Sequence, residues 1–590
     1  MPWPRHLRLP KSASTATTSL PFTYRLLAIA TEIPGELTMN NPVVAEQSEQ
    51  TSEPGVQGPD YEVVVIGAGV GGIYQIKRLI DLGVKATVLE GEDDLGGTWY
   101  RNRYPGARFD SESFTYGYSW DQEILDEWHW TEMFSPQPET LKYLNFVAEK
   151  FGLREHMQFN CYVEKMVFDE GANTWTLFLK DGRILTTHFV LTAIGLLSVP
   201  TLPRIDGVDD YKGQAFHTFN WRHEPINLTG QRVAVIGTGA TSIQLIPEVA
   251  KEAAHLTVFQ RRPNWAAPLN NSEISEEEMA EIRSRYDEIF ATCARTPGGF
   301  EHEPDRRGFY TVSEEERREL WDRLYDGPGF GIWLQNFVEI FMDENANAEF
   351  SEYIAERIRQ RVDDPELAEK LIPKDHGFGI QRVPLETGYF ETYNRDNVTF
   401  VDASETPIER ITESGIQTSD QHYEFDIIVY ATGFDAFTGA FDRIDIRGVN
   451  GESLRDKWAD GPVTYLGLLV EGFPNLLMIS GPQTASTNFP RGAELAVNWA
   501  TELLEHMWSS ELSRFEATPS AEQDWFDHVV KMYEPFLLKT AQSWITGYNS
   551  NLDGHEYGNT RYNIYNGGGP KYADRLRQEA QDGYQGLNID

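Results

Sequence analysis

The feature that most constrains the fold of this chain is a glycine-rich turn between a short strand and a helix. Residues 61–66 (YEVVVI) predict a buried strand, residues 67–72 (GAGVGG) follow it, and residues 73–82 have the pattern of a helix. Such glycines let the backbone approach a pyrophosphate, which the N-terminus of the helix then binds. A second predicted strand, residues 85–89, ends at Glu90, where a carboxylate accepts a hydrogen bond from a ribose hydroxyl. We therefore predict a dinucleotide site formed by Gly67, Gly69, Gly72 and Glu90.

The same unit recurs in the middle of the chain. A predicted strand over 232–236 leads into 237–242 (GTGATS), a helix is predicted from Ile243, and a further strand covers 256–260. The third glycine is here Ser242, which is still small enough for a helix to pack closely on a strand. The repeat predicts a second dinucleotide site.

The residues that follow the second strand of each unit differ in charge. The first unit has Glu90, whereas the second has Arg261 and Arg262. A carboxylate would repel a 2′-phosphate, and guanidinium groups pair with one, often through two hydrogen bonds. The first site is therefore expected to bind FAD or NAD, and the second to bind NADP. The alternative, that both arginines are only solvated surface charges, stays open.

The order of predicted elements indicates an α/β fold with two Rossmann-like domains, one for FAD and one for NADP, and a helical insertion in the NADP domain. The insertion is predicted because the pattern between 270 and 371 is helical and includes a capping box at residues 275–278. The turns 193–195 (AIG) and 431–433 (ATG) are expected where the chain passes between domains. The predicted boundaries are 1–58 for a disordered N-terminal extension, 59–195 and 426–590 for the FAD-binding domain with a C-terminal substrate-loop region, 196–268 and 373–425 for the NADP-binding domain, and 269–372 for the insertion.

Charge and composition exclude several classes of function. The net charge of −40 and the pI near 4.7 leave no basic face for nucleic acid. No apolar run reaches the roughly 20 residues that a membrane-spanning helix needs. Two cysteines, Cys161 and Cys293, are too few for a disulfide framework or a cysteine metal site, and they favour a reducing, cytoplasmic location. We expect no metal, nucleic-acid or membrane partner. The oligomeric state is left open, a monomer included.

The first 38 residues differ in charge from the rest of the chain. They carry four basic residues against Glu32 and Glu36, a net of +2, so the remainder carries −42 (−40 minus +2). An acid-poor start rich in Ser and Thr is also typical of a transit peptide. We favour a natural start at Met39, preceded by upstream sequence or a disordered tail.

Two longer stretches carry a family resemblance. Residues 211–221 (YKGQAFHTFNW) resemble the Baeyer–Villiger fingerprint F-x-G-x-x-x-H-x-x-x-W, and residues 96–110 match [AG]-G-x-W-x-x-x-x-[FY]-P-[GM]-x-x-x-D in full. From about residue 60 to its end the chain resembles class B flavoprotein monooxygenases, and within them the Baeyer–Villiger monooxygenases of the cyclohexanone, phenylacetone and cyclopentadecanone type. The departures are Tyr211 in place of Phe, and Arg222 where Pro or Asp usually follows the tryptophan.

The resemblance implies two cofactors, FAD and NADPH. Gln381 stands where the family usually has a lysine that contacts the 2′-phosphate, which weakens the expected preference for NADPH, and Arg262 could compensate. Arg261 is expected on the 2′-phosphate itself. By the resemblance, Thr98, Trp99, Asp110 and Tyr116 lie near the flavin, Val163 meets the adenine through its backbone, and Gly237, Thr238, Gly239, Ala240, Thr241 and Gln244 bind the NADP pyrophosphate.

The resemblance also implies a catalytic pair and a substrate region. The catalytic arginine of the family corresponds to Arg382, in the run FGIQR, with Asp110 holding its guanidinium. Trp544 resembles the tryptophan of the mobile loop that closes over nicotinamide and substrate. Asn488 and Phe489 are expected to line the substrate pocket. His217 of the fingerprint is interpreted as a packed residue that couples domains, not as a base.

These features together imply a monooxygenase that uses NADPH and O2 to convert ketones, bulky or cyclic ones above all, to esters or lactones. The oxygen is inserted through a flavin C4a-peroxide, which a fixed positive charge such as Arg382 would stabilise. Two alternatives remain: an N- or S-oxygenating flavin monooxygenase, which would not need Arg382, and a non-catalytic redox sensor that binds dinucleotides. A serine hydrolase is excluded, because no G-x-S-x-G elbow is present.

Overall fold

A computed structural model describes residues 58–590, in which both predicted strand–turn–helix units are present. The expected N-terminal extension, up to residue 57, and the expected start at Met39 lie outside the described residues. No helix in the described part is long and apolar enough to span a membrane. Within residues 58–590, no group of three or more His, Cys, Asp or Glu side chains is placed to hold a metal ion.

The first large sheet draws its strands from both ends of the described chain: β1 (Tyr61–Ile66), β2 (Ala86–Leu89), β3 (Met157–Gln158), β4 (Val163–Asp169), β5 (Thr174–Leu179), β6 (Ile184–Thr192), β17 (Asp445–Arg447) and β18 (Leu476–Met478). Its order is β17-β4-β5-β6-β1-β2-β3, with β18 also paired with β6. Strand β1 runs parallel to both of its neighbours, β2 and β6. Strands β17 and β18 come from the C-terminal part of the chain, so this part returns to the first sheet.

The second large sheet contains five strands: β7 (Gln214–His217), β8 (Arg232–Ile236), β9 (His255–Gln260), β12 (Val398–Asp402) and β16 (Ile427–Tyr430). Their order is β12-β9-β8-β16-β7, and all neighbours are parallel. The boundary predicted at residue 426 would assign β16 to the first domain, but β16 pairs with β8 and β7. A fully buried run such as IIVY suits an inner strand of either sheet, so its sequence does not distinguish the two.

Both helices that follow the glycine turns begin three residues earlier than predicted. Helix α1 (Val70–Asp81) starts inside the glycine run, not at residue 73, and α6 (Ala240–Glu252) starts at Ala240, not at residue 243. Gly72 allows the first turn of α1 to pack closely on the turn that precedes it, since a Cβ at this position would lie 1.8 Å from the carbonyl oxygen of Gly67. Gly71 and Gly72 thus belong to the first turn of α1, whereas Gly67 and Gly69 precede the helix.

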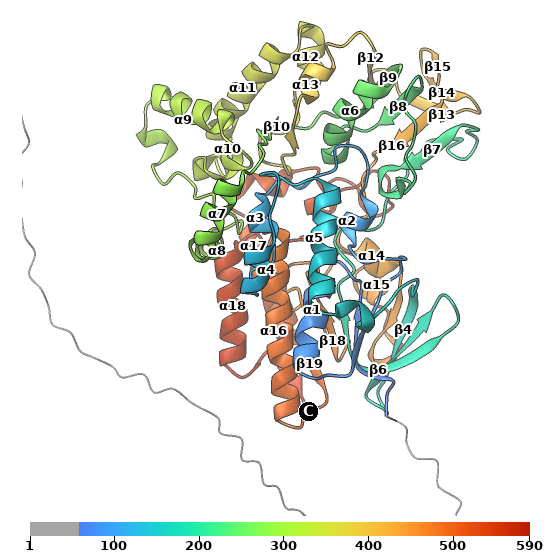
Figure 1. The fold of residues 1–590 in the computed structure, drawn as a ribbon, viewed down its shortest axis with the longest axis vertical. Helices are drawn as coiled ribbons and strands as arrows, with labels where there is room; N and C mark the ends of the chain where they lie inside the picture. Colours follow the sequence, from blue (N-terminus) through green and yellow to red (C-terminus); the bar gives the residue numbers. More distant parts are fainter. Residues whose placement is uncertain (1–57) are drawn as a thin grey trace, which may run out of the picture. The chain divides into compact units, whose positions relative to one another are not determined.

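The predicted helical insertion is present and packs with the second sheet. Its N-terminal capping box is observed, with Ser275 accepting from the backbone of Glu278 and the glutamate side chain returning to Ser275. Figure 1 shows α9, α11 and α12 at the end of the molecule where β8 and β9 lie, with β4 and β6 at the other end. The helices of this segment are α7 (Glu276–Ser284), α8 (Tyr286–Arg295), α9 (Glu314–Asp326), α10 (Gly331–Leu334), α11 (Glu344–Arg361) and α12 (Pro365–Leu371).

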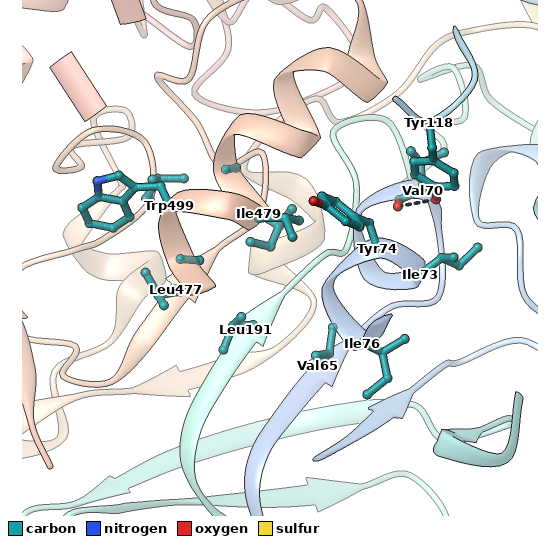
Figure 2. Close-up of a cluster of buried hydrophobic side chains, with 14 of the residues drawn as sticks. Val65, Val70, Ile73, Tyr74, Ile76, Tyr118, Leu191, Leu477, Ile479 and Trp499 are labelled. Atoms are coloured by element: carbon teal, nitrogen blue, oxygen red, sulfur yellow. Dashed lines mark hydrogen bonds between the residues drawn. The ribbon is translucent and has the colours of Figure 1, made fainter. Parts of the chain in front are cut away.

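The core of the first domain lies between its sheet and α16 (Phe489–Ser509), which packs against α1. Helix α16 accommodates Pro490 in its first turn, where the missing N–H of proline costs no helical hydrogen bond. Figure 2 shows Val65 and Leu191 of the sheet facing Tyr74 of α1 and Ile479. The remaining helices are α2 (Thr98–Arg101), α3 (Ser113–Tyr116), α4 (Gln122–Glu127), α5 (Gln137–Lys150), α13 (Tyr389–Thr392), α14 (Gly439–Asp442), α15 (Leu454–Lys457), α17 (Pro519–Tyr533) and α18 (Gly569–Gln581).

Three small sheets complete the described secondary structure. They are formed by β10 (Ala267–Pro268) with β11 (Leu385–Glu386), by β13 (Ile408–Ile411), β14 (Gly415–Thr418) and β15 (His422–Glu424), and by β19 (Phe515–Ala517) with β20 (Leu587–Ile589). The pair β10–β11 brings the chain just after Arg262 beside the chain just after Arg382.

Candidate active site

The two glycine turns are built alike. Gly67 has φ +102° and Gly237 has φ +108°, a conformation that favours glycine. A Cβ at Gly67 would lie 2.5 Å from the carbonyl oxygen of Ala193, and one at Gly237 would lie 2.5 Å from that of Ala431. The turns 193–195 and 431–433, which were expected where the chain crosses between domains, therefore press directly on the two dinucleotide turns.

The helices that leave these turns offer free donors for an anion. Helix α1 begins after Gly69 and α6 begins after Gly239, and neither glycine supplies a side-chain cap. The first amide groups of an α-helix have no partner within the helix, and they carry its positive dipole end. The residues at both turns thus fit the pyrophosphate of a dinucleotide.

Glu90, at the end of β2, is buried and supports the first turn. Its carboxylate accepts hydrogen bonds from the backbone N–H of Ala68 at 2.7 Å and of Glu92 at 2.9 Å. Burial raises its pKa, and these backbone bonds oppose that shift. Each carboxylate oxygen has a second lone pair, so a ribose hydroxyl can still donate to it. The support that Glu90 gives to the turn did not follow from the sequence.

A cleft of about 1090 Å³ connects the two turns. Gly72 and Gly237 do not line the cleft, and they act through the backbone of their turns. Every other residue predicted for the site lines it: Gly67, Gly69, Glu90, Thr98, Trp99, Asp110, Tyr116, Val163, Thr238, Gly239, Ala240, Thr241, Gln244, Arg261, Arg262, Gln381, Arg382, Asn488, Phe489 and Trp544.

An aromatic cluster forms the cleft wall nearest the first turn. The indole Nε1 of Trp99 donates to the hydroxyl of Tyr116 at 2.9 Å, and the ring of Tyr116 stacks on Phe109 with centroids 4.3 Å apart. Burial raises the pKa of Tyr116 far above its usual value, so the phenol stays protonated. The cluster offers a rigid surface for a flat ring system such as a flavin.

The charged centre of the cleft is the pair Arg382–Asp110. The guanidinium Nη1 lies 2.7 Å from Asp110 Oδ2, with the carboxylate 4% exposed and the arginine 33% exposed. Asp110 receives two longer hydrogen bonds, from the backbone N–H of Leu385 at 3.3 Å and from Gln244 Nε2 at 3.4 Å. The ring of Phe330 lies 5.6 Å from the guanidinium carbon. Asp110 therefore orients a guanidinium that is still open to the cleft.

Gln244 of α6 joins the second turn to this pair. Its amide donates to the carbonyl of Arg108 at 3.0 Å, and its oxygen accepts from the hydroxyl of Tyr104 at 2.9 Å. Its side chain is thus largely used in holding residues 104–110 against α6. The prediction that it binds pyrophosphate stays a prediction.

The two arginines of the second unit have different partners. Arg261 Nη1 donates to Ser550 Oγ at 2.6 Å, whereas Arg262 donates to Gln542 Oε1 at 2.8 Å and is paired with Asp375. The hydroxyl of Thr238 donates to the backbone carbonyl of Arg262 at 3.0 Å. Both arginines line the cleft and have specific partners, while Arg261 is exposed and Arg262 is half-buried, so their role in phosphate binding stays a prediction.

The predicted substrate residues lie on two segments. Trp544, in a 3-10 turn over Trp544–Thr546, stacks on Phe437 with centroids 5.6 Å apart. The buried side chain of Asn488 donates to Thr115 at two oxygens, each at 3.1 Å, so it fixes the start of α16 against α3. Phe489, its neighbour, is the first residue of α16.

His217 lies at the end of β7 and does not itself line the cleft, although Phe434, on which it packs, does. Its Nδ1 accepts from the backbone N–H of Phe219 at 3.1 Å, and its ring packs edge-on against Phe434 with centroids 5.3 Å apart. Burial lowers its pKa to about 4. The imidazole is therefore neutral at neutral pH, as a packed residue would be.

One buried charged pair beside the cleft was missed from the sequence. His302 Nε2 lies 2.8 Å from Glu112 Oε1, and both side chains are less than a tenth exposed. Glu112 could have been predicted to lie near the site, because it is only two residues from Asp110 in the chain. Nothing in the sequence distinguishes His302 among 13 histidines.

The chain matches a known family and several named relatives. Residues 60–273 match the family described as flavin-binding monooxygenase-like. The 2-oxo-Δ3-4,5,5-trimethylcyclopentenylacetyl-CoA monooxygenase of Pseudomonas putida is 42% identical over 541 residues, which are 90% of this chain and 99% of the relative. The cyclohexanone 1,2-monooxygenase of Acinetobacter sp is 37% identical over 536 residues, 90% of this chain and 97% of the relative.

A solved structure shows the same similarity. The crystal structure of OTEMO in complex with FAD and NADP aligns with a TM-score of 0.87 and 42% identity over 90% of this chain and 100% of that one. The expected cofactors and the two-domain α/β fold are thereby confirmed. The chain belongs to the Baeyer–Villiger monooxygenases within the flavin-binding monooxygenase-like family, and it is an FAD-dependent, NADPH-consuming oxidoreductase.

Proposed function

We propose that this enzyme uses NADPH and O2 to convert bulky or cyclic ketones to esters or lactones, with Arg382 and Asp110 as the charged pair at the reacting end of the cleft. The observation that carries the proposal is the ion pair of 2.7 Å in a cleft that also contains both dinucleotide turns. The names of the two relatives support the substrate class, since one refers to a cyclopentenyl compound and the other to cyclohexanone.

Arg382 supplies a fixed positive charge. FAD, when bound, supplies the oxygen-insertion chemistry, and NADPH supplies the hydride. A guanidinium remains protonated at any working pH, so it stabilises negative charge that develops on the ketone oxygen. Asp110 balances that charge and fixes its direction, since the carboxylate is buried and its Oδ2 is in contact with Nη1.

Trp544, Phe489 and Phe330 are proposed to enclose the substrate. They come from three distant segments and line the same cleft as Arg382. Apolar walls around one charged group exclude water, which strengthens the electrostatic interaction at that group.

We also propose a reducing, cytoplasmic location. Both cysteines, Cys161 and Cys293, are buried free thiols. Burial raises the pKa of Cys293 to about 12, so its thiol is unreactive.

The proposal is tested with a panel of cyclic ketones, linear ketones, tertiary amines and sulfides under 18O2. NADPH consumption is followed by absorbance and the products by mass spectrometry. We expect one 18O atom in an ester or lactone, with cyclic ketones turned over fastest. Amine or sulfide oxides as the main products, with no ester, would show that the enzyme is an N- or S-oxygenase.

A further inference from the structure

The part of the cleft at the end of β9 carries the charges that would meet a 2′-phosphate. Arg261 and Arg262 follow β9 and line the cleft, and Gln381 lines it without a charge. Two guanidinium groups would make a strong site for a dianion. Their partners in the protein decide how much of that charge is available.

Among residues 58–590, Arg262 is paired with a carboxylate and Arg261 is not. Arg262 Nη2 contacts Asp375, which comes from the segment between α12 and β11. Arg261 contacts the neutral hydroxyl of Ser550. The net charge of the three side chains Arg261, Arg262 and Asp375 is therefore +1, whereas the two arginines alone would carry +2.

Asp375 is held in place on both of its oxygens. Its Oδ1 lies 2.7 Å from His376 Nδ1, and its Oδ2 is the atom that contacts Arg262. The carbonyl of His376 in turn accepts from Trp265 Nε1 at 2.9 Å. Burial acts to raise the pKa of Asp375, but the hydrogen bonds from His376 and Arg262 outweigh it and lower the pKa. The carboxylate is therefore ionised and fixed beside Arg262.

We propose that Asp375 is a specificity-determining residue: it neutralises Arg262 and so weakens binding of the 2′-phosphate, leaving Arg261 as the arginine that distinguishes NADP(H) from NAD(H). This inference rests on the NADP site of the proposed function. The two cofactors differ only in the 2′-phosphate, so repulsion by Asp375 acts on one and not on the other. The preference for NADPH is thus smaller than two free arginines would give.

The test is the substitution Asp375→Asn, which keeps the shape and one oxygen acceptor but removes the charge. The Kd of NADP+ and of NAD+ is measured by calorimetry on the oxidised, FAD-loaded enzyme, at low and at high salt. We expect NADP+ to bind about three- to tenfold more tightly at low salt, the size expected for one like charge removed near the surface. NAD+ should change by less than about twofold, and the gain should shrink at high salt.

Two matched controls separate the charge of Asp375 from other effects. Glu303→Gln removes an exposed carboxylate that is paired with Arg295, outside the cleft lining. Glu369→Gln makes the same change in net charge at an exposed carboxylate that is paired with Arg359 and Lys374. Both controls should leave the ratio of the two Kd values within about twofold of wild type, because neither removes a charge next to the phosphate site.

The outcomes also distinguish this inference from the proposed function. Weaker NADP+ binding by Asp375→Asn would overturn the inference, since the carboxylate would then orient Arg262 for the phosphate. Equal tightening of NADP+ and NAD+ would overturn it as well. If Arg261→Ala weakens NADP+ binding and Asp375→Asn has no effect, the inference alone fails. If neither substitution changes NADP+ binding, the phosphate is bound elsewhere and the proposed NADP site fails too.

Discussion

Replacing Arg382 by alanine removes the positive charge at the reacting end of the cleft and leaves Asp110 without an ionic partner. The remaining donors to Asp110, the N–H of Leu385 and Gln244 Nε2, are at 3.3 and 3.4 Å and compensate only in part. Breaking a buried pair from one side costs about 3–5 kcal/mol. Because the arginine is 33% exposed, water screens the pair, and we expect a loss of about 2 kcal/mol in the free energy of unfolding. The enzyme should therefore still fold and retain FAD.

The loss in oxygen insertion should be much larger than the loss in stability. Removing one preorganised hydrogen-bond donor from a site where negative charge develops costs about 10²–10³ in kcat. Arg382 supplies a full charge, so ester formation in Arg382→Ala should fall by at least about 10³-fold. NADPH should still be oxidised, with hydrogen peroxide released in place of ester. Arg382→Lys should recover little, because a point charge on a flexible stem does not reproduce the planar fork.

The assay combines rapid mixing of the reduced enzyme with O2 and ester analysis by mass spectrometry. Arg317→Ala is the matched control: it breaks an ion pair of 2.8 Å with Glu349 in the insertion, outside the cleft lining. That variant should lose stability and still make ester at close to the wild-type rate. Ester formation by Arg382→Ala within tenfold of wild type would refute the assignment of Arg382 as the catalytic charge.

Three further predictions follow from single residues. Arg261→Ala should weaken NADPH binding by about 1.5–3 kcal/mol, which is measured as a raised KM for NADPH with little change in the KM for NADH. Equal changes in the two KM values would contradict recognition of the 2′-phosphate by this residue. The pKa of His217 is about 4 in the folded protein and about 6.5 in the unfolded chain, so its stabilising contribution is complete above pH 6.5 and is lost as the pH falls toward 4. His217→Gln should therefore flatten the fall of Tm over that interval, and an unchanged pH profile would argue against burial as the cause. Gly67→Ala should abolish FAD binding, because its Cβ would lie 2.5 Å from the carbonyl oxygen of Ala193. Gly239→Ala places its Cβ where no protein atom lies within 4 Å, so this variant should keep FAD and weaken only NADP+ binding. Flavin absorbance per protein measures the first effect, and calorimetry with NADP+ measures the second.

The sequence predicted those parts of the site that depend on local geometry. The strands 61–66 and 232–236 and the capping box at Ser275 are observed as predicted, because strand periodicity and capping are set by neighbours in the chain. The pair Arg382–Asp110 came from the family resemblance, since no local pattern joins residues so far apart. The contact of Arg262 with Asp375 was not predicted, because the two residues are far apart in the sequence and meet only in the folded chain.

Two amide side chains that were predicted for the site line the cleft and also have partners inside the protein that the sequence did not reveal. Asn488 and Gln244 were expected to face substrate and cofactor, and the structure uses much of their hydrogen-bonding capacity inside the protein. A buried polar side chain must find partners, and which partners it finds depends on packing between distant segments. Amide side chains near a cleft are therefore the positions at which sequence reasoning about a site is weakest.

The two connections between the domains explain why His217 lies where it does. They run side by side, with an antiparallel bridge between Pro200 and Phe434. Each connection begins at an alanine pressed on a cofactor turn, Ala193 on the first and Ala431 on the second. The two segments therefore connect the domains and also contact both turns. His217 packs on Phe434 with its imidazole held neutral by burial. Its position thus suits a residue that stabilises the link between two cofactor sites.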